Sequence, residues 1–282
     1  MIQDITPSVF RNAYKPVGPQ GDDVLFYFEG SQGSRRLAVR MDENGIVCPR
    51  AAEAVNSGAE LRYLFSIDDI RYHLALSLTG GCPQGFAMER TSVLRQCRPK
   101  DLCFAGMTAC HLYEWYAANR YCGRCGAKME HSGRERALCC PSCGRVAYPA
   151  IAPAVIIGVT RGDDILMSRY ANREYKGRAL LAGFCEIGET PEQTVEREVL
   201  EEVGLRVCNI RYYGSQPWGF DGGLLLGFFA EADGEDTIVM DTEELERATW
   251  VPRSEIEPDG NLLSLTATMI DAFRLGKEYK RD

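Results

Sequence analysis

The chain has 282 residues, which is long enough for two domains or for one large domain and a small module. Its hydrophobic content of 45% and charged content of 26% are typical of a globular protein, and its apolar runs are far too short to cross a bilayer. The net charge of −8 argues against a protein whose main task is to grip long nucleic acid, although a local basic patch remains compatible with it.

Residues 1–119 form the first predicted domain, which is rich in β-strands. Strand-like runs at residues 23–30, 35–41 and 72–78 alternate with turn-rich connections. A predicted helix around residues 99–120 ends the domain, because its apolar residues recur at helical spacing. Most of the first 90 residues contain no motif, so the prediction there is limited to the strand-rich class.

Residues 120–149 form a cysteine module. Five of the 12 cysteines lie between Cys122 and Cys143, and two C-x2-C pairs separated by 14 residues supply Cys122, Cys125, Cys140 and Cys143. Four thiolates on two short knuckles suit tetrahedral zinc, and four protein ligands leave no open position for chemistry. We therefore expect one structural zinc ion in a zinc ribbon.

Other readings of these cysteines are weaker. The start of the chain contains no apolar signal core, so we expect a cytoplasmic protein, in which a disulfide scaffold is uncommon. Buried or redox-active thiols are the remaining alternative. Cys139 would break the symmetry of the knuckles, and His131 fits no knuckle, so neither is a predicted ligand and His131 is expected to be exposed.

Residues 150–282 form the third predicted domain. Residues 153–170 read as two strands joined by a Gly-Asp turn, followed by further strands at 210–218 and 224–232 and a helix at 265–276. With no repeat of 20 to 50 residues in the chain, these elements predict an α+β architecture throughout.

Between these strands lies a predicted helix at residues 191–203. Thr190 can cap its first turn, Pro191 suits the first helical position, and Gln193 can reach back as in a capping box. Gly204 is a good stop signal. The boundaries of this helix are therefore set by local chemistry.

The helix crowds acidic residues beside its apolar stripe. Glu198 and Glu202 lie four residues apart and converge next to Val195 and Val199, where repulsion between like charges is unfavourable. A divalent cation bound between the two carboxylates makes their proximity favourable, because magnesium and manganese bind hard oxygen ligands. Arg197 can orient one of the acids through a forked hydrogen bond. The alternative is a solvated acidic face with salt bridges.

The spacing G-x5-E-x7-R-E-U-x-E-E-x-G-U, where U is aliphatic, resembles that of the Nudix hydrolases. Nine residues match its fixed positions: Gly183, Glu189, Arg197, Glu198, Val199, Glu201, Glu202, Gly204 and Leu205. The resemblance implies an α/β/α sandwich with a mixed sheet, in which this helix holds two or more magnesium or manganese ions against a diphosphate.

The order of the domains resembles that of one group within the Nudix hydrolases. A β-rich N-terminal domain, a zinc ribbon and a Nudix domain is the layout of the bacterial NADH pyrophosphatases. That family carries S-Q-P-W-P-F-P-x-S after the Nudix helix, where this chain has residues 215–223, SQPWGFDGG. Gly219 and Asp221 replace two prolines and Gly223 replaces the final serine, so the loop is expected to be more mobile and strict NADH preference is in doubt.

The resemblance also implies roles for individual residues. The catalytic set is Glu189, Arg197, Glu198, Glu201 and Glu202, with Glu201 the candidate for activating water or holding a further metal. The expected magnesium or manganese ligands are the carbonyl of Ala182 and the side chains of Glu198, Glu202 and Glu244. The expected substrate-binding residues are Arg95, Tyr148, Phe184, Gln216, Pro217, Trp218, Gly219, Phe220, Asp221, Gly222, Gly223 and Thr266.

The implied reaction is hydrolysis of the diphosphate bridge of NADH or NAD to nicotinamide mononucleotide and AMP, by a homodimer with no membrane partner. One alternative is a broader nucleoside-diphosphate hydrolase acting on, for example, ADP-ribose. Another is removal of NAD caps from RNA 5′ ends, for which Arg124, Lys128, Arg134, Arg136 and Arg145 of the zinc ribbon offer positive charge. The third is an inactive interaction module, against which the intact set of glutamates argues.

Overall fold

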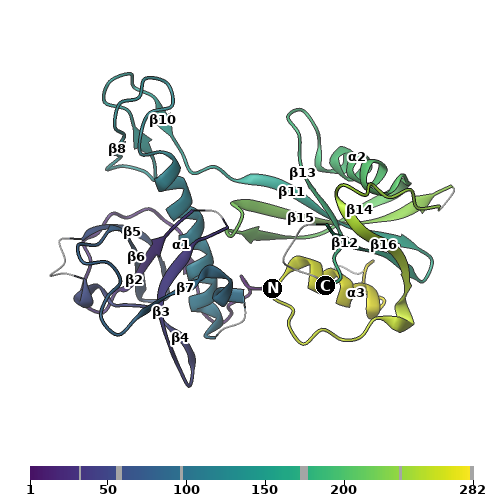
Figure 1. The fold of residues 1–282 in the computed structure, drawn as a ribbon, viewed down its shortest axis with the longest axis horizontal. Coiled ribbons are helices and arrows are strands. Elements are labelled where there is room, and N and C mark those ends of the chain that lie inside the picture. The colour runs from purple at the N-terminus through teal and green to yellow at the C-terminus, as the bar shows by residue number, and fades with distance from the viewer. Residues whose placement is uncertain (32, 55–58, 96–97, 172–176, 235–236, 280–282) are drawn as a thin grey trace. The chain divides into compact units, whose positions relative to one another are not determined.

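The computed structural model describes residues 1–31, 33–54, 59–95, 98–171, 177–234 and 237–279 (Figure 1). It divides into two compact units. The N-terminal unit contains residues 2–151 together with residues 218–222. The C-terminal unit contains Met1, residues 152–217 and residues 223–282.

A seven-stranded sheet dominates the N-terminal unit, in agreement with the predicted strand-rich class. Its strand order is β1-β5-β6-β2-β3-β4, with β7 paired to β3, and the pairing of β2 with β6 is parallel. The strands are β1 (Phe10–Arg11), β2 (Val24–Glu29), β3 (Arg36–Asp42), β4 (Gly45–Val47), β5 (Glu60–Ile67), β6 (Ile70–Ser77) and β7 (Ala87–Arg90). The 3-10 helix η1 (Ala51–Glu53) lies between β4 and β5, and η3 (Thr91–Arg95) lies between β7 and the next helix.

The predicted helix at the end of this domain is α1 (Lys100–Ala118), which packs against β2, β5 and β6. Five consecutive residues, Cys103–Met107, are buried, so the helix is covered on most sides rather than along one stripe. Gly106 permits this close packing, because a Cβ there would lie 2.8 Å from the side chain of Leu94. This helix is therefore a core element of the N-terminal unit.

The cysteine module follows α1 as a small three-stranded sheet in the order β10-β9-β8. Its strands are β8 (Glu130–His131), β9 (Leu138–Cys139) and β10 (Val146–Ala147). Such short strands bury little apolar surface, so the module depends on another source of stability.

The C-terminal unit is built on a six-stranded mixed sheet in the order β14-β15-β11-β12-β16, with β13 paired to β11. The pairing of β11 with β15 is parallel. The strands are β11 (Ala152–Arg161), β12 (Asp164–Tyr170), β13 (Leu181–Phe184), β14 (Arg206–Trp218), β15 (Gly223–Asp233) and β16 (Leu245–Pro252). Arg161 pairs with Asp164 across the predicted Gly-Asp turn, in which Gly162 has a φ of +58°.

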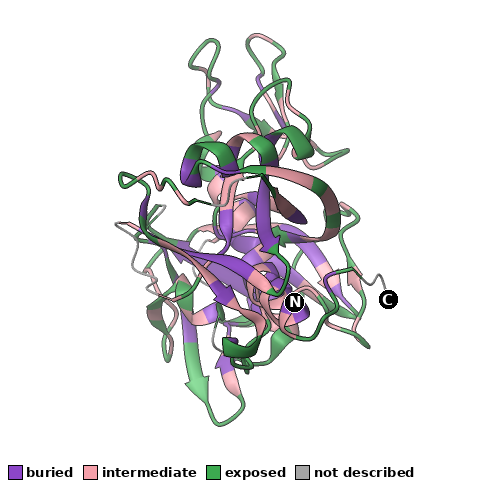
Figure 2. Ribbon diagram, turned by 90° about the vertical axis from the view of Figure 1, so that its right-hand side faces the viewer, coloured by how far each residue is buried: buried purple, intermediate pink, exposed green. Residues whose placement is uncertain are grey.

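Two helices cover opposite faces of this sheet. Alternating residues of β11 divide between two cores: Val155 packs with the apolar stripe of α2 (Pro191–Val203), and Ile156 packs with α3 (Leu265–Arg274). This alternation follows from the two-residue period of a strand. The predicted α/β/α sandwich is therefore confirmed, and in Figure 2 the buried residues run along the strands while the loops are mostly exposed.

The last connection contains η4 (Arg253–Glu255), and Ser264 caps the start of α3 by accepting a hydrogen bond from the Ala267 N–H. In the part of the chain that the structure describes, no helix combines the length and apolar character needed to span a bilayer.

Candidate active site and zinc centre

The acidic helix begins and ends where the sequence predicts. The Thr190 hydroxyl accepts a hydrogen bond from the Gln193 N–H at 3.3 Å, and the Gln193 side chain accepts one from the Thr190 N–H at 2.9 Å. Gly204 takes the left-handed conformation, with a φ of +70°, and its N–H donates to the Leu200 carbonyl. The helix is thus fixed at both ends before any ligand is considered.

Arg197 organises the acidic residues around it. Its guanidinium makes a forked pair with Glu189, at 2.7 Å from Nε to Oε1 and 3.0 Å from Nη2 to Oε2. Nη1 also donates to Glu198 at 2.7 Å and to Glu201 at 3.0 Å. The Phe184 carbonyl accepts a further bond from Nη2 at 3.0 Å. One arginine therefore ties together the loop before the helix and three glutamates.

These contacts shift the protonation of Glu189. Hydrogen bonds from Arg197 are the main cause that lowers the pKa of its carboxyl to about 2, and the Glu186 N–H and the Thr194 hydroxyl add to the effect. The same contacts raise the pKa of Arg197. Both groups are therefore fully charged at neutral pH, as a fixed orienting pair requires.

Glu198 and Glu202 lie in a different environment. Only 9% of Glu198 and 2% of Glu202 is exposed, so neither belongs to a solvated acidic face. Burial is the main cause that raises the pKa of Glu198; it outweighs Arg197, and the charges of Glu201 and Glu244 act in the same direction as burial. A buried carboxylate is unfavourable unless a cation compensates it, and Arg197 compensates Glu198 from one side, so two buried acids beside one arginine favour binding of a further cation.

Gly183 makes room for one of these carboxylates. A Cβ at this position would lie 1.9 Å from Oε1 of Glu198, so only glycine lets the carboxylate rest against β13. The neighbouring Ala182 presents its carbonyl, which accepts a bond from the Tyr170 hydroxyl at 3.3 Å. Carbonyl and carboxylate oxygens are the donor types that magnesium and manganese bind.

Glu244 and Glu201 complete the set of acidic residues that the sequence singles out. Glu244 is exposed, and its backbone carbonyl accepts a bond from the Ala171 N–H at 2.8 Å. It lies near enough to Glu198 for its charge to raise the pKa of that carboxyl. The Glu201 side chain is 60% exposed, which leaves it accessible to water.

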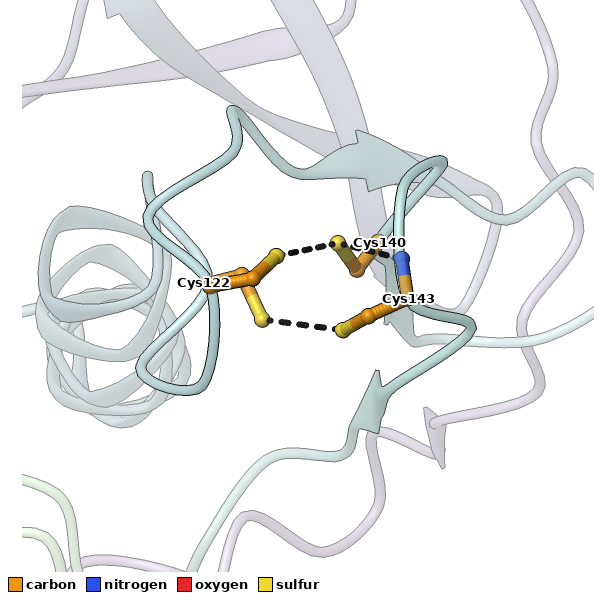
Figure 3. Close-up of side chains that lie close together, drawn as sticks. Cys122, Cys140 and Cys143 are labelled. Carbon is orange, nitrogen blue, oxygen red and sulfur yellow. Dashed lines mark hydrogen bonds between the residues drawn. The ribbon is translucent and has the colours of Figure 1, made fainter.

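The four predicted zinc ligands come together in the ribbon. Their thiol sulfurs all lie within 4.8 Å of one another, with Cys122 3.6 Å from Cys143 and Cys125 3.4 Å from Cys140. Zinc–thiolate bonds of about 2.3 Å place tetrahedral sulfurs about 3.8 Å apart, so the separations fit one zinc ion. Figure 3 shows the Cys122 thiol on one knuckle facing that of Cys143 on the other knuckle, which also carries Cys140.

Cys139 and His131, which the sequence does not predict as zinc ligands, make other contacts in the ribbon. Cys139 lies in β9, where it pairs with Glu130 and Val146. The His131 ring packs 5.2 Å from the ring of Tyr116 and is half-buried. The expectation that His131 is exposed is therefore wrong, because Tyr116 of α1 covers the ring.

The two aromatic residues predicted to stack on substrate both present free ring surface. Tyr148 is 57% exposed, with its hydroxyl donating to Glu135 at 3.0 Å, and Phe184 is 56% exposed. Because large apolar rings are more often covered, exposure of both rings is compatible with binding flat bases.

Gln216 is fully buried, and its amide is engaged by the chain. The side-chain nitrogen donates to the Leu263 carbonyl at 2.9 Å, and the side-chain oxygen accepts from the Leu265 N–H at 2.7 Å. These bonds hold the first turn of α3, in which Thr266 is half-buried. Pro217 is exposed on β14.

The rest of the altered loop, residues 218–222, belongs to the N-terminal unit. The rings of Trp218 and Phe220 meet edge to face at 5.1 Å, and the Arg95 guanidinium lies over both, at 5.1 Å and 4.6 Å from their centroids. Asp221 is exposed, and its charge opposes the effect of burial, which lowers the pKa of Arg95. Gly223 opens β15 opposite Ala152.

Sequence reasoning missed three contributors to this geometry. The Phe184 carbonyl and the Tyr170 hydroxyl act through bonds that no motif marks. Arg35 is 8% exposed and donates to the Phe220 carbonyl, 185 positions later in the chain. A contact over that sequence distance has no local signal.

Comparison with known proteins assigns the two C-terminal parts of the chain. Residues 150–273 match the NUDIX domain family, and residues 117–148 match the family described as NADH pyrophosphatase zinc ribbon domain. The chain thus contains a Nudix domain behind an NADH pyrophosphatase zinc ribbon, as the sequence predicts.

Curated relatives cover part of the chain. A protein named NAD-capped RNA hydrolase NudC from Pseudomonas aeruginosa (strain LESB58) is 42% identical over 160 residues, which are 56% of this chain and 57% of that protein. One of the same name from Escherichia coli O9:H4 (strain HS) is 45% identical over 139 residues, 49% of this chain and 54% of that protein. The chain thus matches slightly more than half the length of these relatives.

Among solved structures, a NUDIX hydrolase from Nitrosomonas europaea matches 57% of this chain and 94% of its own, with a TM-score of 0.49 and 21% sequence identity.

Proposed function

We propose that this protein is a metal-dependent hydrolase of the diphosphate bridge of NADH and NAD, with nicotinamide mononucleotide and AMP as products. One observation carries the proposal. The carboxylates of Glu198 and Glu202 are buried on one helix face, and Gly183 leaves the space in which that of Glu198 meets the backbone of β13. Arg197 balances part of this charge through its contact with Glu198, and a divalent ion would balance the rest.

We propose that magnesium or manganese, two or more ions per site, binds to the Ala182 carbonyl and to the carboxylates of Glu198, Glu202 and Glu244. All four donors are hard oxygens, which distinguishes this site from the thiolate site of the ribbon. When bound, the ions neutralise the charge of the diphosphate and acidify a water molecule for in-line attack on phosphorus.

The residues of the chain orient the reaction. Arg197 holds Glu189, Glu198 and Glu201 through its three nitrogens, so the acids keep their positions as substrate charge arrives. Glu201, which is exposed, accepts the proton of the attacking water. The water oxygen bonds to one phosphorus as the bridging phosphorus–oxygen bond breaks, which gives the two mononucleotides without a covalent enzyme intermediate.

Recognition of the two nucleoside ends rests on the aromatic and loop residues. We propose that Tyr148 and Phe184 stack on the rings of the substrate and that Arg95 contacts the substrate from the N-terminal domain. The segment from Gln216 to Gly223, together with Thr266, shapes the rest of the binding surface. Gln216 does so indirectly, because its amide holds the first turn of α3.

A substrate panel tests the proposal. The purified protein is incubated with NADH, NAD, ADP-ribose and a dinucleoside polyphosphate, each with magnesium or with manganese, and the products are separated by chromatography. The proposal predicts the fastest turnover for NADH or NAD and none after removal of divalent ions. Equal turnover of ADP-ribose would instead support the broader nucleoside-diphosphate hydrolase.

Removal of NAD caps from RNA is a second candidate function, because the curated relatives carry that activity in their names. Four of the five basic ribbon residues, Arg124, Lys128, Arg134 and Arg145, are exposed. Arg136 is half-buried and donates to the Leu64 carbonyl at 2.6 Å, so it is engaged within the N-terminal unit. Capped RNA should lose its cap faster than free NAD is cleaved if this function dominates.

Three further proposals remain from the sequence. We propose a division into domains at residues 1–119, 120–149 and 150–282, a homodimeric assembly and a cytoplasmic location. Sedimentation equilibrium of the full chain tests the assembly, and a mass of one chain at micromolar concentration would exclude it.

A further inference from the structure

The segment Trp218–Gly222 lies along one face of α1. Its glycines lie next to Met107 and His111, and Cys110 and Glu114 on the same face contact Arg35, since these four residues are spaced three and four apart. The segment connects β14 to β15.

Arg35 supplies the polar part of this attachment. It lies just before β3, and its side chain is 7% exposed. Nη2 donates to the Phe220 carbonyl, Nη1 donates to the Cys110 sulfur at 3.0 Å, and Nε lies 3.2 Å from Oε1 of Glu114. The planar guanidinium thus joins the segment to α1 with three nitrogens in one fixed fork.

Gly219 supplies the steric part. A Cβ at this position would lie 2.3 Å from the Met107 carbonyl oxygen and 3.2 Å from Cβ of His111. The clash would be with helix backbone, which cannot move aside as a flexible side chain can. The glycine that replaces a proline in the related motif is therefore what lets the segment reach α1.

The aromatic rings of the same segment lie under a second arginine. The Phe220 ring is buried, the Trp218 ring is half-buried, and Arg95 lies over both. Arg35 holds the backbone at the Phe220 carbonyl, directly beside the ring that Arg95 covers.

We propose that Arg35 is a positioning residue for dinucleotide binding: by anchoring Trp218–Gly222 to α1 of the N-terminal unit, it sets the geometry of the surface that receives the substrate. The inference rests on the proposed NAD(H) diphosphatase activity. It gives the N-terminal domain a part in substrate affinity, while the acidic helix that performs hydrolysis remains independent of it.

Steady-state kinetics on the full-length protein test this role. Arg35→Met removes the three donors and keeps the length of the side chain. We expect the KM for NADH to rise about tenfold while kcat stays within about threefold, because only binding geometry is disturbed. Arg35→Lys should give a similar rise, since one ammonium group cannot replace the fork.

Arg71→Met is the matched control. Arg71 lies in the same unit and pairs with the buried Asp23 at 3.0 Å, so its loss removes an ion pair away from the segment. This variant should lower the melting temperature and leave both kinetic constants unchanged. A purely structural role for Arg35 would make the two variants behave alike.

Gly219→Ala disturbs the same contact between the segment and α1, and it tests the proposal if Arg35→Met does not fold. It should also raise KM, whereas Gly214→Ala, at a position with no heavy atom within 4 Å of the added Cβ, should not. If the wild-type protein does not hydrolyse NADH, the proposed function fails. If it does and both test variants keep the wild-type KM, the role of Arg35 alone is refuted.

Discussion

The zinc ribbon and the acidic helix both gather ligand atoms, but they hold them in different ways. In the ribbon the four thiol sulfurs lie within 4.8 Å of one another and form a complete set by themselves. At α2 one arginine contacts Glu198 and Glu201 of the helix and Glu189 before it, and Glu198 and Glu202 are buried while Glu201 is exposed. Four thiolates that fill the coordination sphere suit a structural zinc ion. Oxygen ligands that leave coordination positions open suit a catalytic metal ion.

The largest expected effect comes from removing a buried carboxylate charge. Glu202→Gln should reduce turnover of NADH by at least about 10³-fold, because a neutral amide no longer offers a strong ligand to a divalent ion. Zinc content and the circular dichroism spectrum should not change, since the ribbon is separate in sequence.

The exposed Glu196 on the same helix provides the control for that experiment. Glu196→Gln makes the same chemical change outside the buried pair and should keep near wild-type turnover. Full activity in Glu202→Gln would mean that the catalytic centre lies elsewhere.

A substitution of a zinc ligand in the ribbon should change zinc content and folding, which Glu202→Gln leaves unchanged. Cys140→Ser should release the zinc and unfold the module, because zinc binding supplies on the order of 10 kcal/mol to folding of such a small unit. Metal analysis and thermal melting would measure both changes. Cys139→Ser is the adjacent control and should retain one zinc per chain, because Cys139 lies in β9 and outside the cluster.

A smaller effect is expected from Gly183→Ala. The added Cβ would lie 1.9 Å from Oε1 of Glu198, so the carboxylate or β13 must shift. A displacement of about 1 Å at a reacting group lowers kcat by about 100-fold. Kinetics with NADH would measure it, and Gly214→Ala controls for adding a methyl group; equal activity of both variants would contradict the geometry.

The smallest expected effect is a difference between the pH at which the ribbon releases zinc and the pH at which Glu189 becomes protonated. The folded pKa of Glu189 is about 2, below its unfolded value, so its pair with Arg197 stabilises the protein above pH 4.5 and is lost as the pH falls toward 2. Cysteine thiolates compete with protons for zinc at higher pH. Acid titration should therefore release zinc first, as measured with a chromogenic chelator, and protonate Glu189 later, as measured by carboxyl NMR. A carboxyl of Glu189 that titrates near pH 4.5 would contradict this order.

The features that could be predicted from the sequence are local in the chain. The zinc ligands lie within one short segment, and Thr190, Gln193 and Gly204 fix the ends of α2 through contacts over a few residues. The apolar run at residues 154–159 likewise predicts a strand, and both of its faces are covered because successive side chains point to opposite sides of the sheet.

The features that could not be predicted are contacts between distant segments. The bond from Arg35 to the Phe220 carbonyl and those from Gln216 to Leu263 and Leu265 depend on the completed fold. The conformational freedom of Gly219 predicts a mobile loop. In the structure, however, Gly219 packs on α1, where a larger residue would clash with the helix backbone. Composition alone does not distinguish these two uses of glycine.

The central claim is that the buried acids of α2 bind divalent ions. A crystal grown with manganese and a non-hydrolysable dinucleotide, examined at the manganese absorption edge, tests it most directly. We expect anomalous peaks at about 2.1 to 2.2 Å from the carboxylate oxygens of Glu198 and Glu202. An ordered dinucleotide with no anomalous peak beside these two residues would contradict it.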